Sequence, residues 1–291
     1  MHQLVPSFIL DRYAEQDFSG DFDAAGLFLD ISGFSSMIND LMAHGQHGAE
    51  VMAEIMRSVL DPLITIVYEQ GGFIANSAGD AITALFPVQS NSAEACLRAL
   101  SAAHAMQERM HAHPHYATPY QVFSIFAKVG LAFGQVNWGI ICSEQYERGV
   151  YYFQGTAVDR CAEAEHHADA GDVILDRAFL DQVQTQVTTT PIEAYFRISS
   201  IRVDQLPPAL PIQPQTSALD LMSYFYPEEL LTQELTGEFR QVVNMFIALP
   251  SVREESQLRI FMESLFALQD RYGGLLDGLD FGDKGTNLLL F

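Results

Sequence analysis

The hydrophobic positions at the start of the chain alternate between two periods. Short apolar runs at residues 27–31, 73–75 and 81–86 predict strands, and the last two are close enough to form a hairpin. Between them, apolar side chains recur every three or four residues through 48–70, which is the period of a helix with one buried face. The first segment therefore reads as strand, helix and hairpin, with Pro62 expected to kink or divide the long helix.

The same alternation continues for another hundred residues. Helices are expected at residues 35–43, 92–111 and 157–167, and strands at 122–133, 135–142, 151–154 and 172–175. Strands mixed with helices in this way predict an α/β (α+β) fold.

The composition changes near residue 206. The stretch "LPPALPIQPQ" is rich in proline and is typical of a linker, and the following "LDLMSYFYPEELLTQEL" predicts a docking helix. A strand, a helix, Gly273-Gly274 and a hairpin then repeat the order of the first segment. We therefore expect a domain at residues 1–205, a connection at 206–236, and the N-terminal part of a second, truncated copy at 237–291.

Composition narrows the classes of partner. Hydrophobic residues make up 48% of the 291-residue chain and charged residues 18%, a globular balance, while the net charge is −22. That charge argues against binding to nucleic acid or to an anionic membrane, since both need Lys and Arg. No signal peptide or membrane-spanning run is visible, and three widely spaced cysteines are typical of reduced thiols, so we expect a cytoplasmic protein.

Two aspartates are set into apolar strands, Asp30 in "LFLDISGF" and Asp80 in "SAGDAITALFP". If the strands are neighbours, both carboxylates reach the same place, where they repel unless a proton or cation joins them. Magnesium suits such a pair, and two ions can clamp the attacking and leaving oxygens of a phosphoryl displacement. The alternative is that each aspartate is a solvated turn residue.

These two motifs, together with "KVGLAFGQVNWGI" and "YYFQGTAVDRCAEAEHHADAGDVILD", resemble a class III adenylyl/guanylyl cyclase catalytic domain. The resemblance is strongest to the first of the paired domains of bicarbonate-responsive soluble adenylyl cyclases and covers about residues 5–200. Residues 237–291 resemble the start of the second paired domain. The resemblance implies a ferredoxin-like cyclase sandwich whose active site forms against a second cyclase-like domain, in the same chain or in another.

The resemblance also implies a reaction and a set of site residues. ATP would be converted to cyclic AMP and pyrophosphate with two Mg²⁺ or Mn²⁺ ions, held by Asp30, Asp80 and the carbonyl of Ile31. Backbone N–H groups of a helix start would meet the triphosphate. The nucleotide-binding residues implied are Ser32, Gly33, Phe34, Ser35 and Asn76.

Several positions depart from the family pattern. Where the family has an Asn and an Arg that serve the ribose and the transition-state phosphate, this chain has Asp159, Ala162 and Glu163. An acidic side chain cannot stabilise further negative charge on a phosphate. In the second copy, Ala248 replaces a metal-binding aspartate, which the resemblance leads us to expect because only the first of the paired domains holds the metal. Gly278 falls near the position of the adenine-selecting lysine, so the second copy also departs from the pattern.

Asn76 and Ala162 also replace the lysine and arginine of the family's bicarbonate site, so the resemblance does not carry bicarbonate control over to this chain. The departures leave an alternative function open: a catalytically degenerate cyclase-like domain that acts as a regulatory nucleotide-binding or dimerisation module. A different two-metal nucleotidyl transferase is a third, weaker hypothesis.

Overall fold

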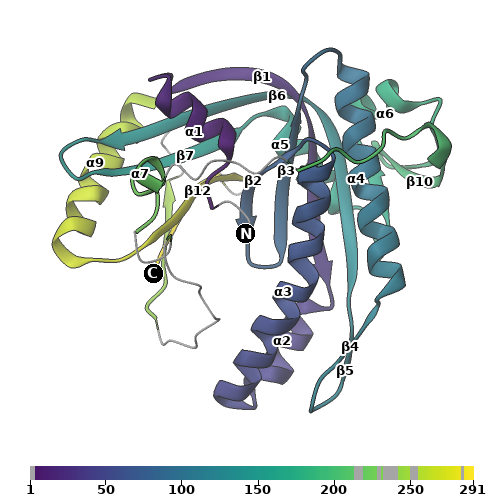
Figure 1. The fold of residues 1–291 in the computed structure, drawn as a ribbon, viewed down its shortest axis with the longest axis horizontal. Helices are drawn as coiled ribbons and strands as arrows, with labels where there is room; N and C mark the ends of the chain where they lie inside the picture. The colour runs from purple at the N-terminus through teal and green to yellow at the C-terminus, as the bar shows by residue number, and fades with distance from the viewer. Residues whose placement is uncertain (1–3, 213–218, 228–230, 232–241, 250–254, 283–284) are drawn as a thin grey trace.

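The computed structural model describes residues 4–212, 219–227, 231, 242–249, 255–282 and 285–291. Its main sheet has eight strands in the order β2-β3-β1-β6-β8-β10-β9, and β7 also pairs with β6 (Figure 1). The strands are β1 (Ser19–Ser32), β2 (Phe73–Ala78), β3 (Ala81–Pro87), β6 (Phe126–Ser143), β7 (Arg148–Gln154), β8 (Val173–Leu175), β9 (Val187–Ile192) and β10 (Tyr195–Ile201).

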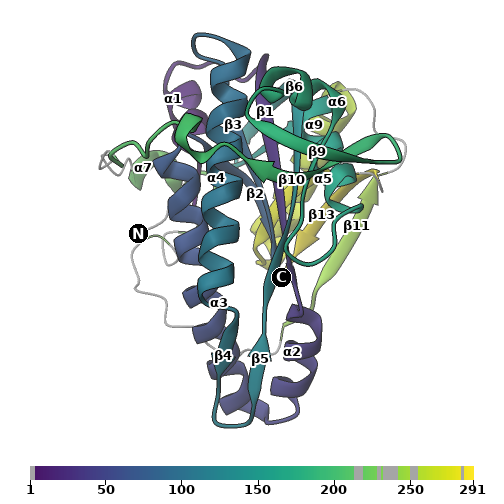
Figure 2. The ribbon, with the colours of Figure 1, turned by 90° about the vertical axis from the view of Figure 1, so that its right-hand side faces the viewer.

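Helices cover both faces of this sheet. They are α1 (Ser7–Ala14), α2 (Phe34–Met42), α3 (Gly45–Glu69), α4 (Ser92–Ala112), α5 (Thr156–Glu165), α6 (Arg177–Val183), the 3₁₀ turn η1 (Val203–Gln205) and α7 (Leu219–Met222). Figure 2 shows α3 and α4 on one side of the sheet and α5 on the other. Strands β2-β3-β1-β6 are antiparallel and are joined by these helices in ferredoxin-like order, which confirms the predicted sandwich.

Alternation along β1 explains its central position. Leu27, Leu29 and Ile31 are buried in the core cluster that α3 and α4 share with the sheet. The residues between them, Phe28 and Asp30, project from the opposite face, because successive strand residues point to opposite sides. Asp30 therefore lies on the face away from α3 and α4.

Helix α5 approaches this second face very closely. A Cβ atom added to Gly130 of β6 would lie 2.0 Å from the backbone oxygen of Cys161 and 2.4 Å from the backbone nitrogen of Glu165. A Cβ at Gly26 of β1 would lie 2.4 Å from the oxygen of Ala157. Glycine at both positions allows the backbone of α5 to rest directly on the sheet.

The C-terminal strands form a separate small sheet. Strands β11 (Met245–Leu249), β12 (Leu276–Gly282) and β13 (Gly285–Leu290) pair in the order β11-β13-β12, and α9 (Glu255–Tyr272) connects the first two. Strands β1, β3 and β2 have the same order in the main sheet. Apolar side chains of α9, β12 and β13 pack with Ile141 of β6 and with Val150 and Tyr152 of β7, so the two sheets share a hydrophobic contact.

The structure corrects four details of the sequence interpretation. Residues 126–143 form one strand rather than two, and α3 runs through Pro62 without division. Strands β9 and β10 follow residue 175, where no further strand was expected. Pro114 and its polar surroundings predict a loop at His115, but that residue lies in the short β4 (His115–Ala117), which pairs with β5 (Val122–Ser124).

Parts of the predicted linker and docking helix lie outside the described residues, at 213–218, 228–230 and 232–241. Among the described helices, none has the length and the apolar character that crossing a bilayer requires.

Candidate active site

Asp30 and Asp80 come together at one end of the main sheet. Asp30 is near the end of β1, directly opposite Ala81 of β3 in the antiparallel register. Asp80 immediately precedes Ala81, in the tight turn between β2 and β3, where Gly79 has φ of 65°. Directly opposed strand residues are about 5 Å apart, so the turn brings the second aspartate beside the first.

The electrostatics of Asp80 reflect this proximity. Burial raises the pKa of the Asp80 carboxyl group, and the charge of Asp30 raises it further, partly offset by a backbone hydrogen bond and by the charge of Lys128. A carboxyl group whose pKa is raised by burial and by a neighbouring carboxylate marks a place where a cation is favourable.

Lys128 completes this group, and the sequence analysis did not identify it. It lies opposite Asp30 on β6, and its Nζ is 3.1 Å from Oδ2 of Asp30 and 2.5 Å from Oε1 of Glu165. Burial alone would lower the pKa of Lys128, but its hydrogen bonds to Glu165 and Asp30 outweigh burial and raise it. A lone lysine in the apolar strand "KVGLAFG" was the available signal, yet only the strand register reveals its partner.

The predicted phosphate-binding residues lie where β1 gives way to α2. Ser32 ends the strand, and Gly33 takes φ of 93° before the helix begins at Phe34. A Cβ at Gly33 would lie 2.6 Å from the backbone oxygen of Ser124, so this tight turn requires glycine. The first N–H groups of α2, including that of Ser35, have no partner within the helix and favour an anion.

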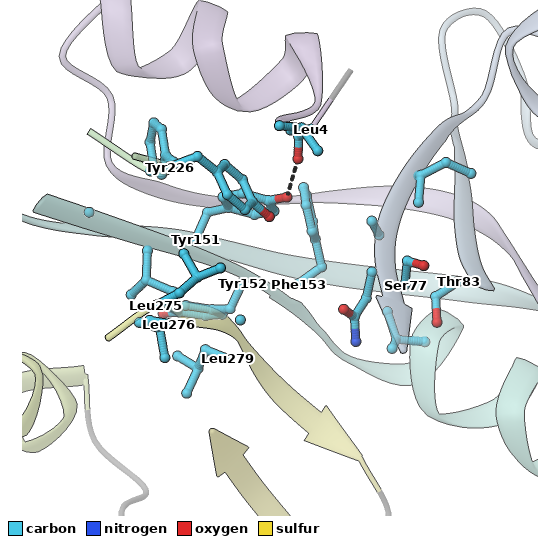
Figure 3. Close-up of a pocket in the computed structure, with 18 of the residues that line it drawn as sticks. Leu4, Ser77, Thr83, Tyr151, Tyr152, Phe153, Tyr226, Leu275, Leu276 and Leu279 are labelled. Atoms are coloured by element: carbon cyan, nitrogen blue, oxygen red, sulfur yellow. Dashed lines mark hydrogen bonds between the residues drawn. The ribbon is translucent and has the colours of Figure 1, made fainter. Parts of the chain in front are cut away.

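Asn76 lines a cavity of about 430 Å³ between the main sheet and the C-terminal strands (Figure 3). Thr83 and Ser77 of the hairpin, aromatic side chains of β7, and Leu276 and Leu279 of β12 also line it. Asn76 pairs with Thr83, which in turn lies opposite Phe28 on the same face as Asp30. The structure thus places Asn76 in a neighbouring cavity of small-molecule size, and the aspartates do not line that cavity.

The acidic positions of α5 lie on the exposed side of that helix. The hydroxyl group of Tyr195 donates a hydrogen bond to Oε2 of Glu163 at 2.7 Å. Burial and the neighbouring charge of Glu163 raise the pKa of Asp159. Neither side chain offers the positive charge or the amide donor that a transferring phosphate needs.

The carboxylate pair has the donor chemistry of a magnesium or manganese site. Two carboxylates and a following backbone carbonyl, that of Ile31, are oxygen ligands of the kind these ions take. The pKa of Asp80 is raised first by burial and then by the charge of Asp30, and a divalent cation beside the pair would favour the ionised form of both carboxyl groups. Across the part of the chain that the structure describes, no group of three or more His, Cys, Asp or Glu residues is arranged to hold a metal.

Comparison with known sequences finds similarity over a limited region. No family model matches the chain. The mouse protein named adenylate cyclase type 10 is 26% identical over 190 residues, which is 62% of this chain and 11% of the mouse protein. The human protein of the same name is 25% identical over 195 residues, or 65% of this chain and 12% of that protein. The chain thus matches only about a tenth of these relatives.

Comparison with solved structures identifies the fold. The adenylyl cyclase CyaB from P. aeruginosa superposes with a TM-score of 0.52 at 16% identity, covering 64% of this chain and 98% of that one. The catalytic core of a rhodopsin-guanylyl cyclase with converted specificity, in complex with ATPαS, gives a TM-score of 0.51 and covers 62% of this chain and 98% of its own. At 16% identity these matches establish shared architecture.

Proposed function

Because the main sheet and its helices have the fold of a class III nucleotidyl cyclase catalytic domain, we propose that this chain contributes the metal-binding half of an enzyme that converts ATP to cyclic AMP and pyrophosphate. The observation that carries the proposal is the meeting of Asp30 and Asp80 at one end of the sheet, beside Lys128. A scaffold without chemistry would gain nothing from two adjacent carboxylates.

The proposed reaction is an internal phosphoryl transfer. The 3′-hydroxyl group of the nucleotide attacks the α-phosphate, and pyrophosphate leaves. Asp30, Asp80 and the Ile31 carbonyl would hold two Mg²⁺ or Mn²⁺ ions, which would stabilise the charge of the phosphates. The N–H groups at the start of α2 would bind the triphosphate, and the Lys128 ammonium group is close enough to the pair to neutralise phosphate oxygens.

We propose ATP as the substrate because the curated relatives are named adenylate cyclases. A guanylate cyclase domain of Catenaria anguillulae, which shares the fold at a TM-score of 0.50, was solved in complex with GTP. The fold is therefore compatible with either purine. ATP use would also be consistent with a cytoplasmic location.

A second cyclase-like domain would have to provide the transition-state groups, because Asp159 and Glu163 cannot. That partner domain lies in this chain or in another. Within this chain, we propose that residues 237–291 are the N-terminal part of such a domain and residues 206–236 its connection to the domain at 1–205. The common strand order of β11-β13-β12 and β1-β3-β2 supports this division.

The second candidate is a degenerate cyclase-like module that binds nucleotide or a partner domain without turnover. Acidic residues at the Asn/Arg positions and the loss of two family lysines, at Asn76 and near Gly278, favour it. The two candidates share the nucleotide site and differ in the chemistry that follows binding.

Calorimetry with Mn²⁺ and a non-hydrolysable ATP analogue tests the shared site. We expect the chain to bind the complex and the Asp30→Ala, Asp80→Ala double variant to lose binding. Asp23→Ala is the matched control, since Asp23 is an exposed carboxylate on the same strand. Equal binding by the wild-type chain and the double variant would overturn the proposed site.

Mass spectrometry of the products formed from ATP and from GTP then separates the two candidates. Cyclic AMP formed by the chain, alone or mixed with an active second cyclase domain, supports the enzyme. Nucleotide binding without any cyclic product under both conditions favours the degenerate module.

A further inference from the structure

Lys128 is held by two carboxylates of very different exposure. Its ammonium group contacts Oδ2 of Asp30, whose side chain is 28% exposed, and Oε1 of Glu165, whose side chain is 4% exposed. Asp30 is therefore accessible to an incoming ion, whereas Glu165 is enclosed by protein. The two contacts cannot have the same role when the site is occupied.

The fold explains why Glu165 is enclosed beside the candidate site. It is the last residue of α5, and its backbone nitrogen passes close above Gly130 of β6. Lys128 and Gly130 are two residues apart on one strand and so point to the same face. Because α5 lies so close to β6, the Glu165 carboxylate reaches the Lys128 ammonium group.

The balance of charges also distinguishes the contact of Lys128 with Glu165 from its contact with Asp30. A buried carboxylate is costly unless it is paired, and Lys128 provides that pairing for Glu165. With its charge balanced from the interior, Lys128 does not need Asp30 as its counter-ion. Asp30 can therefore exchange the ammonium group for a metal ion without leaving Lys128 unpaired.

We propose that Glu165 is a positioning residue: it anchors the Lys128 ammonium group beside the carboxylate pair, so that Lys128 turns from Asp30 to a phosphate oxygen when a metal–nucleoside triphosphate complex binds. This inference rests on the proposed function and extends it to a residue that touches neither the metal nor the nucleotide. The anchor also keeps Lys128 from competing with the metal for Asp30.

Three variants isolate this role. Glu165→Gln removes the charge and keeps the shape, Glu165→Asp keeps the charge and withdraws it by one methylene group, and Lys128→Met removes the cation. Glu54→Gln, at an exposed glutamate on α3, matches the loss of one negative charge. Circular dichroism melts would show that each variant is folded before binding is compared.

The measurement is calorimetric affinity for Mn²⁺ alone and for Mn²⁺ with a non-hydrolysable ATP analogue. We expect Glu165→Gln to weaken both by about five- to tenfold, because a coupled charge network changes by roughly 1 kcal/mol or more when one member is lost. Glu165→Asp should weaken both affinities as Glu165→Gln does, because the withdrawn carboxylate no longer reaches the Lys128 ammonium group. Wild-type affinity for Glu165→Asp would contradict the positioning role. Glu54→Gln should bind as wild type does.

A double-mutant cycle decides whether Glu165 acts through Lys128. In the Lys128→Met background, Glu165→Gln is expected to have no further effect on either affinity. An undiminished effect in that background, or wild-type affinity for Glu165→Gln alone, would overturn the positioning role while leaving the proposed function in place. Absence of Mn²⁺–nucleotide binding by the wild-type chain would overturn both.

Discussion

Strands β1 and β11 occupy the same place in two sheets of the same order, but their surroundings differ. Strand β1 pairs with β3 on one side and β6 on the other, whereas within the described residues β11 pairs with β13 alone. Leu27 of β1 is fully buried, while Phe246 of β11 is 73% exposed. Asp30 lies near the end of the first strand and Ala248 near the end of the second.

This difference shows that the shared strand order does not itself create the candidate site. Both sheets contain the strand followed by a hairpin, but only the main sheet places Asp30, Asp80 and Lys128 together on neighbouring strands. The candidate site depends on side chains from β1, from the turn between β2 and β3, and from β6. In the described part of the small sheet, no counterpart of β6 pairs with β11, so a counterpart of Lys128 is absent there as well.

Truncation of an equivalent apolar residue in β1 and in β11 should give the largest difference in the free energy of unfolding. Leu27→Ala is expected to destabilise the chain by about 3 kcal/mol, because a buried leucine leaves a cavity when shortened. Met245→Ala, at a side chain that is 55% exposed, should stay within about 0.5 kcal/mol of wild type. Urea unfolding followed by far-UV circular dichroism provides the comparison, and similar costs at both sites would contradict the difference in burial.

Addition of one methyl group tests the packing of α5. Gly130→Ala places a Cβ 2.0 Å from a backbone oxygen that cannot turn aside, so we expect a loss of about 2–3 kcal/mol. Gly278→Ala in β12 meets nothing within 4 Å and is the matched control, with little expected change. The same unfolding measurement applies, and an unaffected Gly130→Ala variant would show that helix and sheet separate easily.

Two variants test the candidate site directly: one removes the carboxylate from β1, and the other adds a carboxylate at the equivalent position of β11. Asp30→Ala is expected to lower Mn²⁺ affinity by at least about 100-fold, since even outer-shell changes cost 10–100-fold. Ala248→Asp should not create a further Mn²⁺ site, because the described residue directly opposite position 248 is Asn287 and not a second carboxylate. Titration of Mn²⁺ by electron paramagnetic resonance counts the bound ions. A larger number of bound ions in Ala248→Asp than in the wild-type chain would contradict this expectation.

The buried carboxyl group of Asp176 should make the stability of the main sheet depend on pH, and we expect this effect to be the smallest of those predicted here. Burial raises the pKa of Asp176, which caps α6 by accepting a hydrogen bond from the backbone N–H of Phe179, whereas Gln269 of α9 is buried but cannot titrate. An acid with a raised folded-state pKa stabilises the fold below its ordinary value of 3.8, and that stability is lost as the pH rises through the raised value.

Asp176→Asn keeps the cap acceptor and removes the titration. The variant is therefore expected to melt slightly above wild type at pH 7 and no higher at pH 3.5. Thermal melts at pH 7 and pH 3.5 check this. Gln269→Glu is the reciprocal variant, and its melting temperature should fall further below that of wild type at pH 7 than at pH 3.5. A constant difference between wild type and Asp176→Asn at both pH values would contradict the role of burial.

Most of the main sheet was predictable because its strands are apolar and its helices periodic. Strands β9 and β10 were not, since "VTTTPI" alternates only weakly in burial and carries Pro191, which an edge strand tolerates. Two strands were expected on either side of Gly134, but β6 continues through it. Glycine is needed there for another reason: an added Cβ would lie 2.3 Å from Oγ1 of Thr156.

Only part of the candidate site was predictable from the sequence. Asp30 and Asp80 stood out because a carboxylate is unusual within an apolar run. Lys128 and Glu165 did not stand out, because their importance comes from strand register and from the contact of α5 with β6, and neither can be read from spacing along the chain.

The ion pairs of Lys128 also bear on how the proposed site would take up a metal ion. A site made only of clustered carboxylates would repel itself until an ion arrived, and its folding would depend on metal supply, as it does in zinc fingers. Here Lys128 is a built-in counter-ion for Asp30 and Glu165. Under the proposed function, metal uptake would therefore be an exchange at Asp30 in an already folded chain, reversible with free Mg²⁺.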